Sequence, residues 1–262
     1  MKSFKSFVKS DKEDAGTIPA PIHFKHIPEV ETKKGVIPSP ITFKQEYTFD
    51  EPELKEAKKD KPSIHDWIKE NDNTHLFSKK VKNNEGLSNF LSKSNKNDDE
   101  DTEHVTEYCG ETTSTELNNR LLKNKKLSDY HKETSDGIDR HIDKNKMKHE
   151  LHVYSGLSFD PEKHMKKNKL HSPCYISTTH DKQIASEFSE FNKPNKKKKI
   201  QHIAHIHLKP GDSATHISEH SLFPEEHETL IKRGSTLKHH GYKEHHDEKT
   251  GDVVRIHHFT IV

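Results

Sequence analysis

Two glutamates separated by one residue are the side chains whose types and spacing most suggest chemistry. Glu226 and Glu228 lie in segment 224–231, which reads PEEHETLI. In an extended chain, residues two apart project to the same face. One carboxylate could then stabilise a developing cation while the other takes a proton from a nucleophile. For this segment alone, however, a charged strand end without function is the better interpretation.

Two further segments carry groups that could act with the glutamates. Segment 175–179 reads YISTT and ends a strand-like run in hydroxyls, with Ala185 and Phe188 on the helix expected next. Such hydroxyls can orient a carboxylate or hold a polar ligand, although Ser and Thr at strand ends usually contact solvent or cap helices. Segment 151–157, LHVYSGL, is an apolar-aromatic strand that ends in a glycine turn.

The elements that must position these segments follow from a change in hydrophobic period along the chain. Helices are expected at 63–69, 114–125 and 129–143. After residue 150 the pattern becomes one of short strands with a single helix at 181–191. The expected strands are 151–154, 175–178, 200–208, 228–231, 236–240 and 253–262. Helices followed by short strands predict an α+β fold rather than alternating βαβ units.

Composition predicts that only part of the chain folds. Of its 262 residues, 27% are hydrophobic and 33% are charged. Because apolar burial is the main term that offsets chain entropy, a sizeable segment should stay unfolded. Residues 1–62 are that segment. They repeat IPAPIHFK at 18–25 as IPSPITFK at 37–44, and paired prolines disfavour helix and central strand. The repeat is either a partner-docking tether or a linker.

Charge, apolar content and cysteine number exclude several classes. No stretch approaches the roughly 20 apolar residues of a membrane span, so an integral membrane protein is excluded. A net charge of +1 gives no global basic field for nucleic acid. Two cysteines, Cys109 and Cys174, form no disulfide framework and indicate a reducing compartment. The N-terminus lacks the apolar core of a secretory signal. We therefore expect a cytosolic site of action.

Taken in order, the three segments resemble the mono-ADP-ribosyltransferase superfamily in its toxin and phage branch. That family has a strand ending in aromatic-Arg-Gly and a Ser-Thr-Ser strand followed by Ala and Phe on a helix. Its Glu-x-Glu strand runs on to a basic residue and glycine. The matching segments here are 153–157, 177–179 with Ala185 and Phe188, and 226–231 with Arg233 and Gly234. Segment 202–211 is similar to the family's central strand and turn, and 108–122 to its first conserved helix.

The resemblance covers residues 104–262, and 63–103 loosely, so we expect a transferase domain at 63–262 with its motif core at 104–262. It implies N-terminal helices followed by two packed, mainly antiparallel small sheets around an NAD cleft. The implied reaction transfers ADP-ribose from NAD to an acceptor with release of nicotinamide. The implied acceptor is an arginine of a host protein, with RNA as the other candidate and no membrane partner. A phage or bacterial effector in the host cytosol is the implied setting.

The resemblance also implies roles for individual residues. Glu228 would hydrogen-bond the ribose and stabilise its oxocarbenium-like transition state. Glu226 would position or deprotonate the acceptor, and Ser177 would hold Glu228 in place. Phe223, in the loop before the glutamates, would contact the acceptor. The residues implied to bind NAD are Tyr154, Ser155, Gly156, Ser177, Thr178 and Phe188, of which Phe188 could instead fill the core.

One position departs from the family pattern, because Ser155 stands where the family has the arginine that grips the NAD phosphates. Serine offers one neutral hydrogen bond and no charge. Another cation, such as Arg120, Arg140 or a neighbouring histidine, would have to replace it, or the chain is divergent or inactive. A catalytically inactive binding module that keeps the transferase fold is therefore an alternative.

A histidine-rich metal-binding protein is the second alternative. The chain has 24 histidines, among them His205 and His207 on one face of an expected strand. Zinc sites need three or four convergent ligands, and no HExxH or CxxC spacing occurs. The sequence therefore predicts a histidine-rich surface and no metal site.

Overall fold

A computed structural model describes residues 62–70, 72–77, 81–95, 101–110, 112–191, 200–248 and 250–262. The N-terminal segment predicted at 1–62, with its proline repeat, lies outside these residues except for Pro62. Within the described part of the chain, six α-helices precede the first strand, where the sequence predicts three. They are α1 (Ile64–Lys69), α2 (Thr74–Phe77), α3 (Asn84–Ser94), α4 (Thr102–Tyr108), α5 (Thr113–Leu122) and α6 (Asp129–Lys144).

Side-chain caps set where several of these helices begin. The Ser63 hydroxyl accepts a hydrogen bond from the His65 backbone N–H at 3.2 Å, and the Ser128 hydroxyl accepts one from the His131 N–H at 3.2 Å. These caps satisfy backbone donors that have no partner within the helix. The helices expected near 63–69, 114–125 and 129–143 are thus confirmed as α1, α5 and α6. The segment 108–122 is not one continuous helix, since residues 109–112 separate α4 from α5.

The remaining elements form the sheet and its connections. They are β1 (Leu151–Leu157), η1 (Pro161–His164), β2 (Lys169–His171), β3 (Ile176–Thr179), α7 (Lys182–Phe191), β4 (Ile200–Leu208), β5 (Ala214–His216), η2 (Ser218–His220), η3 (Pro224–Glu226), β6 (Glu228–Ile231), β7 (Thr236–His246) and β8 (Val253–Ile261). The α+β class predicted from the sequence is therefore confirmed.

The expectation of two separate sheets needs correction. Over the residues that the structure describes, the strands form one sheet in the order β2-β7-β8-β4-β1-β3-β6-β5. Neighbouring strands are antiparallel except for the parallel pair β4 and β8. A single register pair, Tyr154 with Thr179, joins the five-stranded part to the three-stranded part. Backbone pairing continues through this junction, so the two packed units are parts of one sheet.

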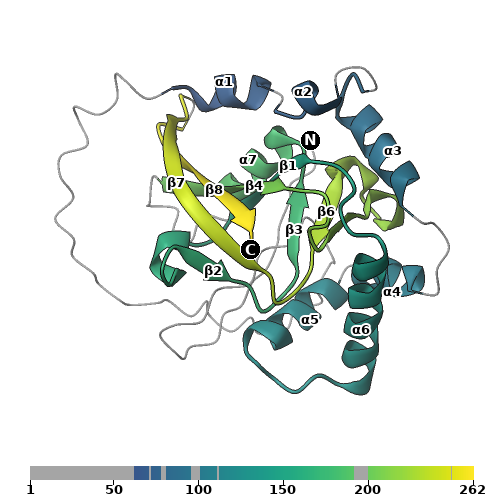
Figure 1. Ribbon diagram of the computed structural model, residues 1–262. Coiled ribbons are helices and arrows are strands. Elements are labelled where there is room, and N and C mark those ends of the chain that lie inside the picture. The colour runs from purple at the N-terminus through teal and green to yellow at the C-terminus, as the bar shows by residue number, and fades with distance from the viewer. Residues whose placement is uncertain are drawn as a thin grey trace, which may run out of the picture.

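Both parts of the sheet nevertheless pack on a shared apolar core. Val153, Ile206 and Phe259 from the five-stranded part lie in the same buried cluster as Ile176 and Ile231 from the three-stranded part. In Figure 1, β3 and β6 run at a steep angle to β4. The sheet therefore bends at the β1–β3 junction and encloses this inner core between its two parts.

Helices cover the outer faces of the sheet. Trp67 of α1 and Ala185 of α7 pack with Tyr154 and Ile256 on the five-stranded part. The helices α4, α5 and α6 pack on β3 and β6 through a second cluster that contains Tyr108, Leu117, Ile138, Ile142, Tyr175 and Leu230. No helix in the described ranges is long and apolar enough to cross a membrane.

Candidate active site

The strand register brings the three sequence motifs together at the junction of the sheet. Tyr154 of β1 pairs with Thr179 at the end of β3, and Thr179 pairs with Glu228 at the start of β6. The three motifs, of which the first and last are 74 positions apart in sequence, thus lie on three neighbouring strands (Figure 1). The bend of the sheet occurs at the same place, so the motifs meet where its two parts diverge.

The two glutamates are both buried, but not for the reason that simple strand alternation suggests. Glu228 is the first residue of β6 and Glu226 is the last residue of η3, and their exposed fractions are 2% and 6%. Between them, His227 adopts the left-handed conformation, with φ 52° and ψ 45°. A turn rather than an extended chain therefore sets the relative orientation of the two carboxylates. Burial of acidic side chains at this level is unusual and costly.

A tyrosine that the sequence analysis did not select lies within the electrostatic reach of Glu228. Tyr108 of α4 is fully buried, and burial first, then the charge of Glu228, raises its pKa well above 10.0. Its hydroxyl accepts a hydrogen bond from Asn118 Nδ2 at 3.1 Å, and Asn118 Oδ1 accepts one from the Tyr175 N–H at 3.2 Å. Tyr108 and Asn118 thus connect α4 and α5 to the strand that carries the hydroxyl motif.

The hydroxyl motif divides between the two faces of β3. Ser177 pairs with Leu230, so it lies on the same face as Glu228 and diagonally across from it. Thr179 is directly opposite Glu228, and its hydroxyl accepts from the Asp181 N–H at 3.0 Å, just before α7. The Thr178 hydroxyl donates to the Thr229 carbonyl at 2.6 Å. Thr178 and Thr179 therefore use their hydroxyls to fix the backbone around the site.

Residues of the first motif point in different directions. Tyr154 packs edge-on against Trp67, with ring centroids 5.4 Å apart, and its hydroxyl donates to Asp72. Ser155 lies on the inner face, and its fully buried hydroxyl has no hydrogen-bond partner within the described ranges. At Gly156, a Cβ would lie 2.4 Å from the Ser189 backbone nitrogen of α7. Glycine is required here because helix and strand approach so closely.

Two aromatic candidates occupy intermediate positions. Phe188 of α7 and Phe223, which precedes η3, are each partly exposed. The loop that holds Phe223 also presents Leu222, whose exposed fraction is 59%. Phe223 is held locally, since its N–H donates to the Ser221 hydroxyl at 3.1 Å. The loop before the glutamates therefore offers apolar surface to solvent.

Residues 79–257 match the family model described as ADP-ribosyltransferase exoenzyme. The chain belongs to this family. The protein is accordingly an NAD-dependent ADP-ribosyltransferase, and NAD is its substrate. A comparison with curated protein sequences gave no match.

Solved structures of similar fold are bacterial ADP-ribosyltransferases. The C3 exoenzyme of Clostridium limosum aligns with a TM-score of 0.53 and 16% identity, over 69% of this chain and 96% of that chain. An ADP-ribosyltransferase of Clostridium botulinum aligns with a TM-score of 0.51 and 15% identity, over 69% of this chain and 98% of that chain. The Vis toxin of Vibrio splendidus aligns with a TM-score of 0.50 and 13% identity, over 72% of this chain and 90% of that chain. At these identities the likeness shows the fold of the transferase.

The arginines suggested as replacements at Ser155 are engaged elsewhere in the transferase. Arg140 of α6 pairs with buried Asp101 at 2.7 Å, and Lys144 donates to the same carboxylate at 2.8 Å. Burial alone would raise the pKa of Asp101, but the hydrogen bonds from these two cations lower it below 3.8. Arg120 donates to the Lys126 carbonyl at 3.5 Å on the surface of α5. These contacts fix the helices rather than present a cation at β1.

The basic residue that follows the Glu-x-Glu strand also has a positioning contact. Arg233 donates to Asp139 of α6 at 2.8 Å and to Asp136 at 3.2 Å. Tyr175 donates to the other oxygen of Asp139 at 2.8 Å. This network fixes α6 against both the residue before β3 and the turn after β6. Arg233, the basic residue of the Arg-Gly match to the family, therefore has a structural role beside the site.

Three histidines adjoin the site and were missed by the sequence analysis. The rings of His180 and His227 stack with centroids 4.9 Å apart, and the ring centroid of His216 lies 5.7 Å from that of His180. Burial and the neighbouring His227 lower the pKa of His180 to about 4. His216 contacts the Thr229 hydroxyl at 3.2 Å. His227 separates the two glutamates and His180 directly follows the hydroxyl motif, so proximity in the sequence could have selected both. Only His216 depends on the strand register, which pairs it with Thr229.

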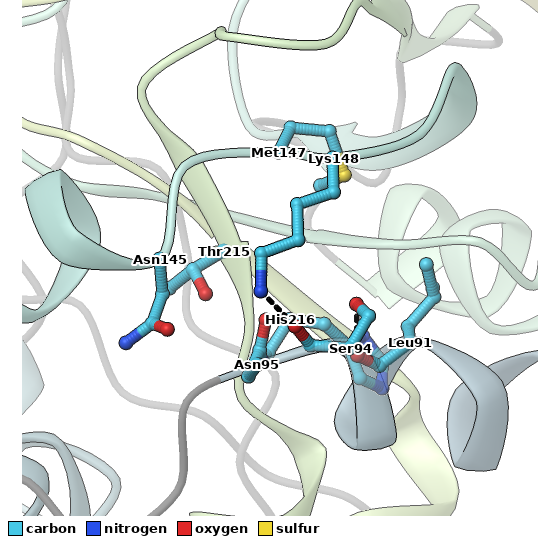
Figure 2. Close-up of a pocket in the computed structure, with 8 residues that line it drawn as sticks. All are labelled: Leu91, Ser94, Asn95, Asn145, Met147, Lys148, Thr215 and His216. Atoms are coloured by element: carbon cyan, nitrogen blue, oxygen red, sulfur yellow. Dashed lines mark hydrogen bonds between the residues drawn. The ribbon is translucent and has the colours of Figure 1, made fainter.

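A small pocket near His216 is distinct from the motif residues. It is lined by Leu91, Ser94, Asn95, Asn145, Met147, Lys148, Thr215 and His216 (Figure 2). Its volume of about 10 Å³ leaves room for about one water molecule. This pocket is therefore not where a dinucleotide would bind.

Proposed function

We propose that this transferase moves ADP-ribose from NAD to the guanidinium group of an arginine in a host protein. The observation that carries the proposal is the burial of Glu226 and Glu228 at the sheet junction, with Glu228 paired to Thr179. Two buried carboxylates two residues apart suit a reaction that develops a cation and also removes a proton.

In the proposed reaction, Glu228 accepts a hydrogen bond from the nicotinamide ribose and stabilises positive charge at its anomeric carbon. The glycosidic C–N bond breaks, and nicotinamide leaves with the electron pair. A guanidinium nitrogen of the acceptor then forms the new bond to this carbon and loses a proton, which passes to Glu226. Burial strengthens both effects because the local dielectric constant is low. Ser177, on the same face as Glu228, positions that carboxylate.

Contacts to NAD are proposed for the first and second motifs. The buried Ser155 hydroxyl is suited to a neutral hydrogen bond with the diphosphate, and Gly156 allows close approach of α7. Phe188 lies on that helix and would pack near the nicotinamide. Tyr154 and Thr178 already use their hydroxyls on Asp72 and the Thr229 carbonyl. We therefore assign these two residues a positioning role around the NAD site.

The arginine acceptor is supported by the chemistry of Glu226 and of its loop. A guanidinium has a pKa above 12, so its nitrogen attacks readily only when a carboxylate takes the proton. One similar structure, the Vis transferase, was solved in complex with agmatine, which carries the same guanidinium group as arginine. Phe223 and the exposed Leu222 would contact the acceptor protein. We place this reaction in the cytosol of a host cell.

Transfer of labelled ADP-ribose from NAD to agmatine tests the proposal. The Glu226→Gln variant should lose agmatine labelling by about 10²–10⁴-fold, the usual contribution of a general base. It should still release nicotinamide to water, because Glu228 remains. The matched control is Glu225→Gln, which changes the exposed neighbouring carboxylate and should label agmatine like the wild type.

Equal labelling by Glu226→Gln and wild type would contradict the role of Glu226. Nicotinamide release without agmatine labelling in the wild type would contradict the guanidinium acceptor. Neither nicotinamide release nor labelling from the folded wild-type protein would favour the inactive binding module, for which Ser155 is the specific observation.

A further inference from the structure

Two histidines and one aspartate converge on the inner face of the five-stranded part of the sheet. His202 of β4 and His257 of β8 bring their Nδ1 and Nε2 atoms to 3.0 Å from each other. Asp160, between β1 and η1, completes a group in which one ligand atom from each residue lies within 4.8 Å of the others. The exposed fractions of His202 and His257 are 6% and 0%.

The spacing of these atoms fits a four-coordinate ion. Zinc–nitrogen bonds of about 2.0–2.1 Å in a tetrahedral site separate the two nitrogens by about 3.3 Å. The observed 3.0 Å between His202 and His257 needs an adjustment of a few tenths of an ångström. Two imidazoles and a carboxylate are also the donor set that zinc prefers, whereas calcium and magnesium prefer oxygen alone.

The surroundings hold the ligands in place. His257 Nδ1 lies 3.3 Å from His239 Nε2 of β7, so a hydrogen bond supports the ring on the side away from His202. Such a contact commonly orients a metal-bound histidine. Asp160 Oδ1 accepts from the Glu162 N–H at 3.1 Å, which fixes the carboxyl group at the start of η1.

Charge near the group is balanced. Arg255, two residues before His257 on the same strand face, pairs with Glu244 at 2.9 Å. The charge of Arg255 is thus offset by Glu244, and the Asp160 carboxylate is available to balance an incoming cation.

We propose that Asp160, His202 and His257 form a binding site for a divalent transition-metal ion of the zinc type. Three protein ligands leave a fourth position for water. The ion ties the segment after β1 to β4 and β8, on the face of the sheet that also carries Ser155. This proposal departs from the sequence expectation of no metal site. The ligands are 42 and 55 positions apart, so no short motif could show them.

Metal titration of the untagged full chain tests this site. Chelator-treated protein is titrated with Zn²⁺, and Co²⁺ serves as a probe whose visible absorption reports tetrahedral coordination. We expect one Zn²⁺ per chain. Saturation at about 100 times the dissociation constant should raise Tm by about 5–11 °C. Asp160→Asn and His202→Gln should each weaken binding by at least about 10-fold.

His240→Gln is the matched control, because it removes a histidine beside His239 that is not part of the group. It should bind Zn²⁺ like the wild type. Asp160→Asn removes a partly exposed carboxylate, so it keeps the test valid if His202→Gln fails to fold. Absence of stoichiometric Zn²⁺ binding by the wild type would overturn the proposal. Unchanged affinity in a folded Asp160→Asn protein, or equal loss in His240→Gln, would also overturn it.

Discussion

The close packing of α7 on β1 gives a prediction whose size can be worked from the structure. In Gly156→Ala, the new Cβ would lie 2.4 Å from the Ser189 nitrogen, 2.8 Å from the Phe188 carbonyl carbon and 2.9 Å from the Ala185 oxygen. Ordinary contact needs about 3.5–4.0 Å, so α7 must retreat by about 1 Å. All three atoms belong to backbone, and no side-chain rotation can relieve the clash.

The expected cost is about 3 kcal/mol of unfolding free energy, at the upper end of overpacking effects. At about 2–4 °C per kcal/mol for a domain of this size, Tm should fall by about 6–12 °C. Because α7 follows the hydroxyl motif directly, transferase activity should fall as well. Thermal unfolding followed by circular dichroism measures the first effect, and nicotinamide release from NAD measures the second.

Gly251→Asn provides the control for this substitution. Gly251 has a φ of +73°, a Cβ added there would have nothing within 4 Å, and asparagine tolerates the left-handed conformation. Its Tm should stay within about 2–4 °C of the wild type, a change of about 1 kcal/mol. If Gly156→Ala were as stable as Gly251→Asn, the close approach of α7 to β1 would be refuted.

Three further predictions concern acid stability, a buried hydroxyl and an ion pair. His180 has its pKa lowered to about 4 by burial and by His227, so the unfolded chain protonates first as pH falls below 6.5. The free energy of unfolding, measured with urea, should therefore be about 2 kcal/mol lower at pH 5.0 than at pH 7.5 because of this residue alone. A His180→Asn protein that keeps the full pH dependence would contradict this. Ser155→Ala should leave Tm unchanged or raise stability by up to about 1 kcal/mol while raising KM for NAD, and an unchanged KM would remove Ser155 from the NAD site. Asp101→Ala should lower the free energy of unfolding, measured with urea, by about 1–3 kcal/mol, whereas Lys132→Ala at an exposed ion pair should lower it by under about 0.5 kcal/mol. Equal losses would contradict the role of Asp101 in holding α6 through Arg140 and Lys144.

Much of the fold could be predicted from local patterns in the sequence. The bounds expected for the strands at 200–208 and 228–231 agree with β4 and β6, because each is an apolar run bounded by clear breaks. The three-residue strands β2 and β5 were missed, since so short a run carries no hydrophobic period. The break between α4 and α5 was also missed. Leucines of α5 continue a helical pattern that hides the end of α4 at Tyr108 and the start of α5 at Thr113.

The candidate site was predictable to the level of its motifs but not of its surroundings. Glu228 and Ser177 could be selected because the order of three motifs resembles one family. Tyr108 and His216 could not, because their position beside the site depends on tertiary packing and on strand register. The arrangement of Glu226 also differed from simple alternation. A left-handed residue at His227 could not be read from the sequence, since histidine, although enriched in that conformation, adopts it in only a small minority of cases.

Nicotinamide release from NAD by purified Glu228→Gln protein tests the central claim most directly. The substitution keeps the size of the side chain and removes the charge proposed to stabilise the ribose cation. We expect the rate to fall by at least about 10²–10³-fold relative to the wild type, with unchanged circular dichroism. A Glu228→Gln protein that releases nicotinamide at the wild-type rate would contradict the assignment of Glu228 as the catalytic carboxylate.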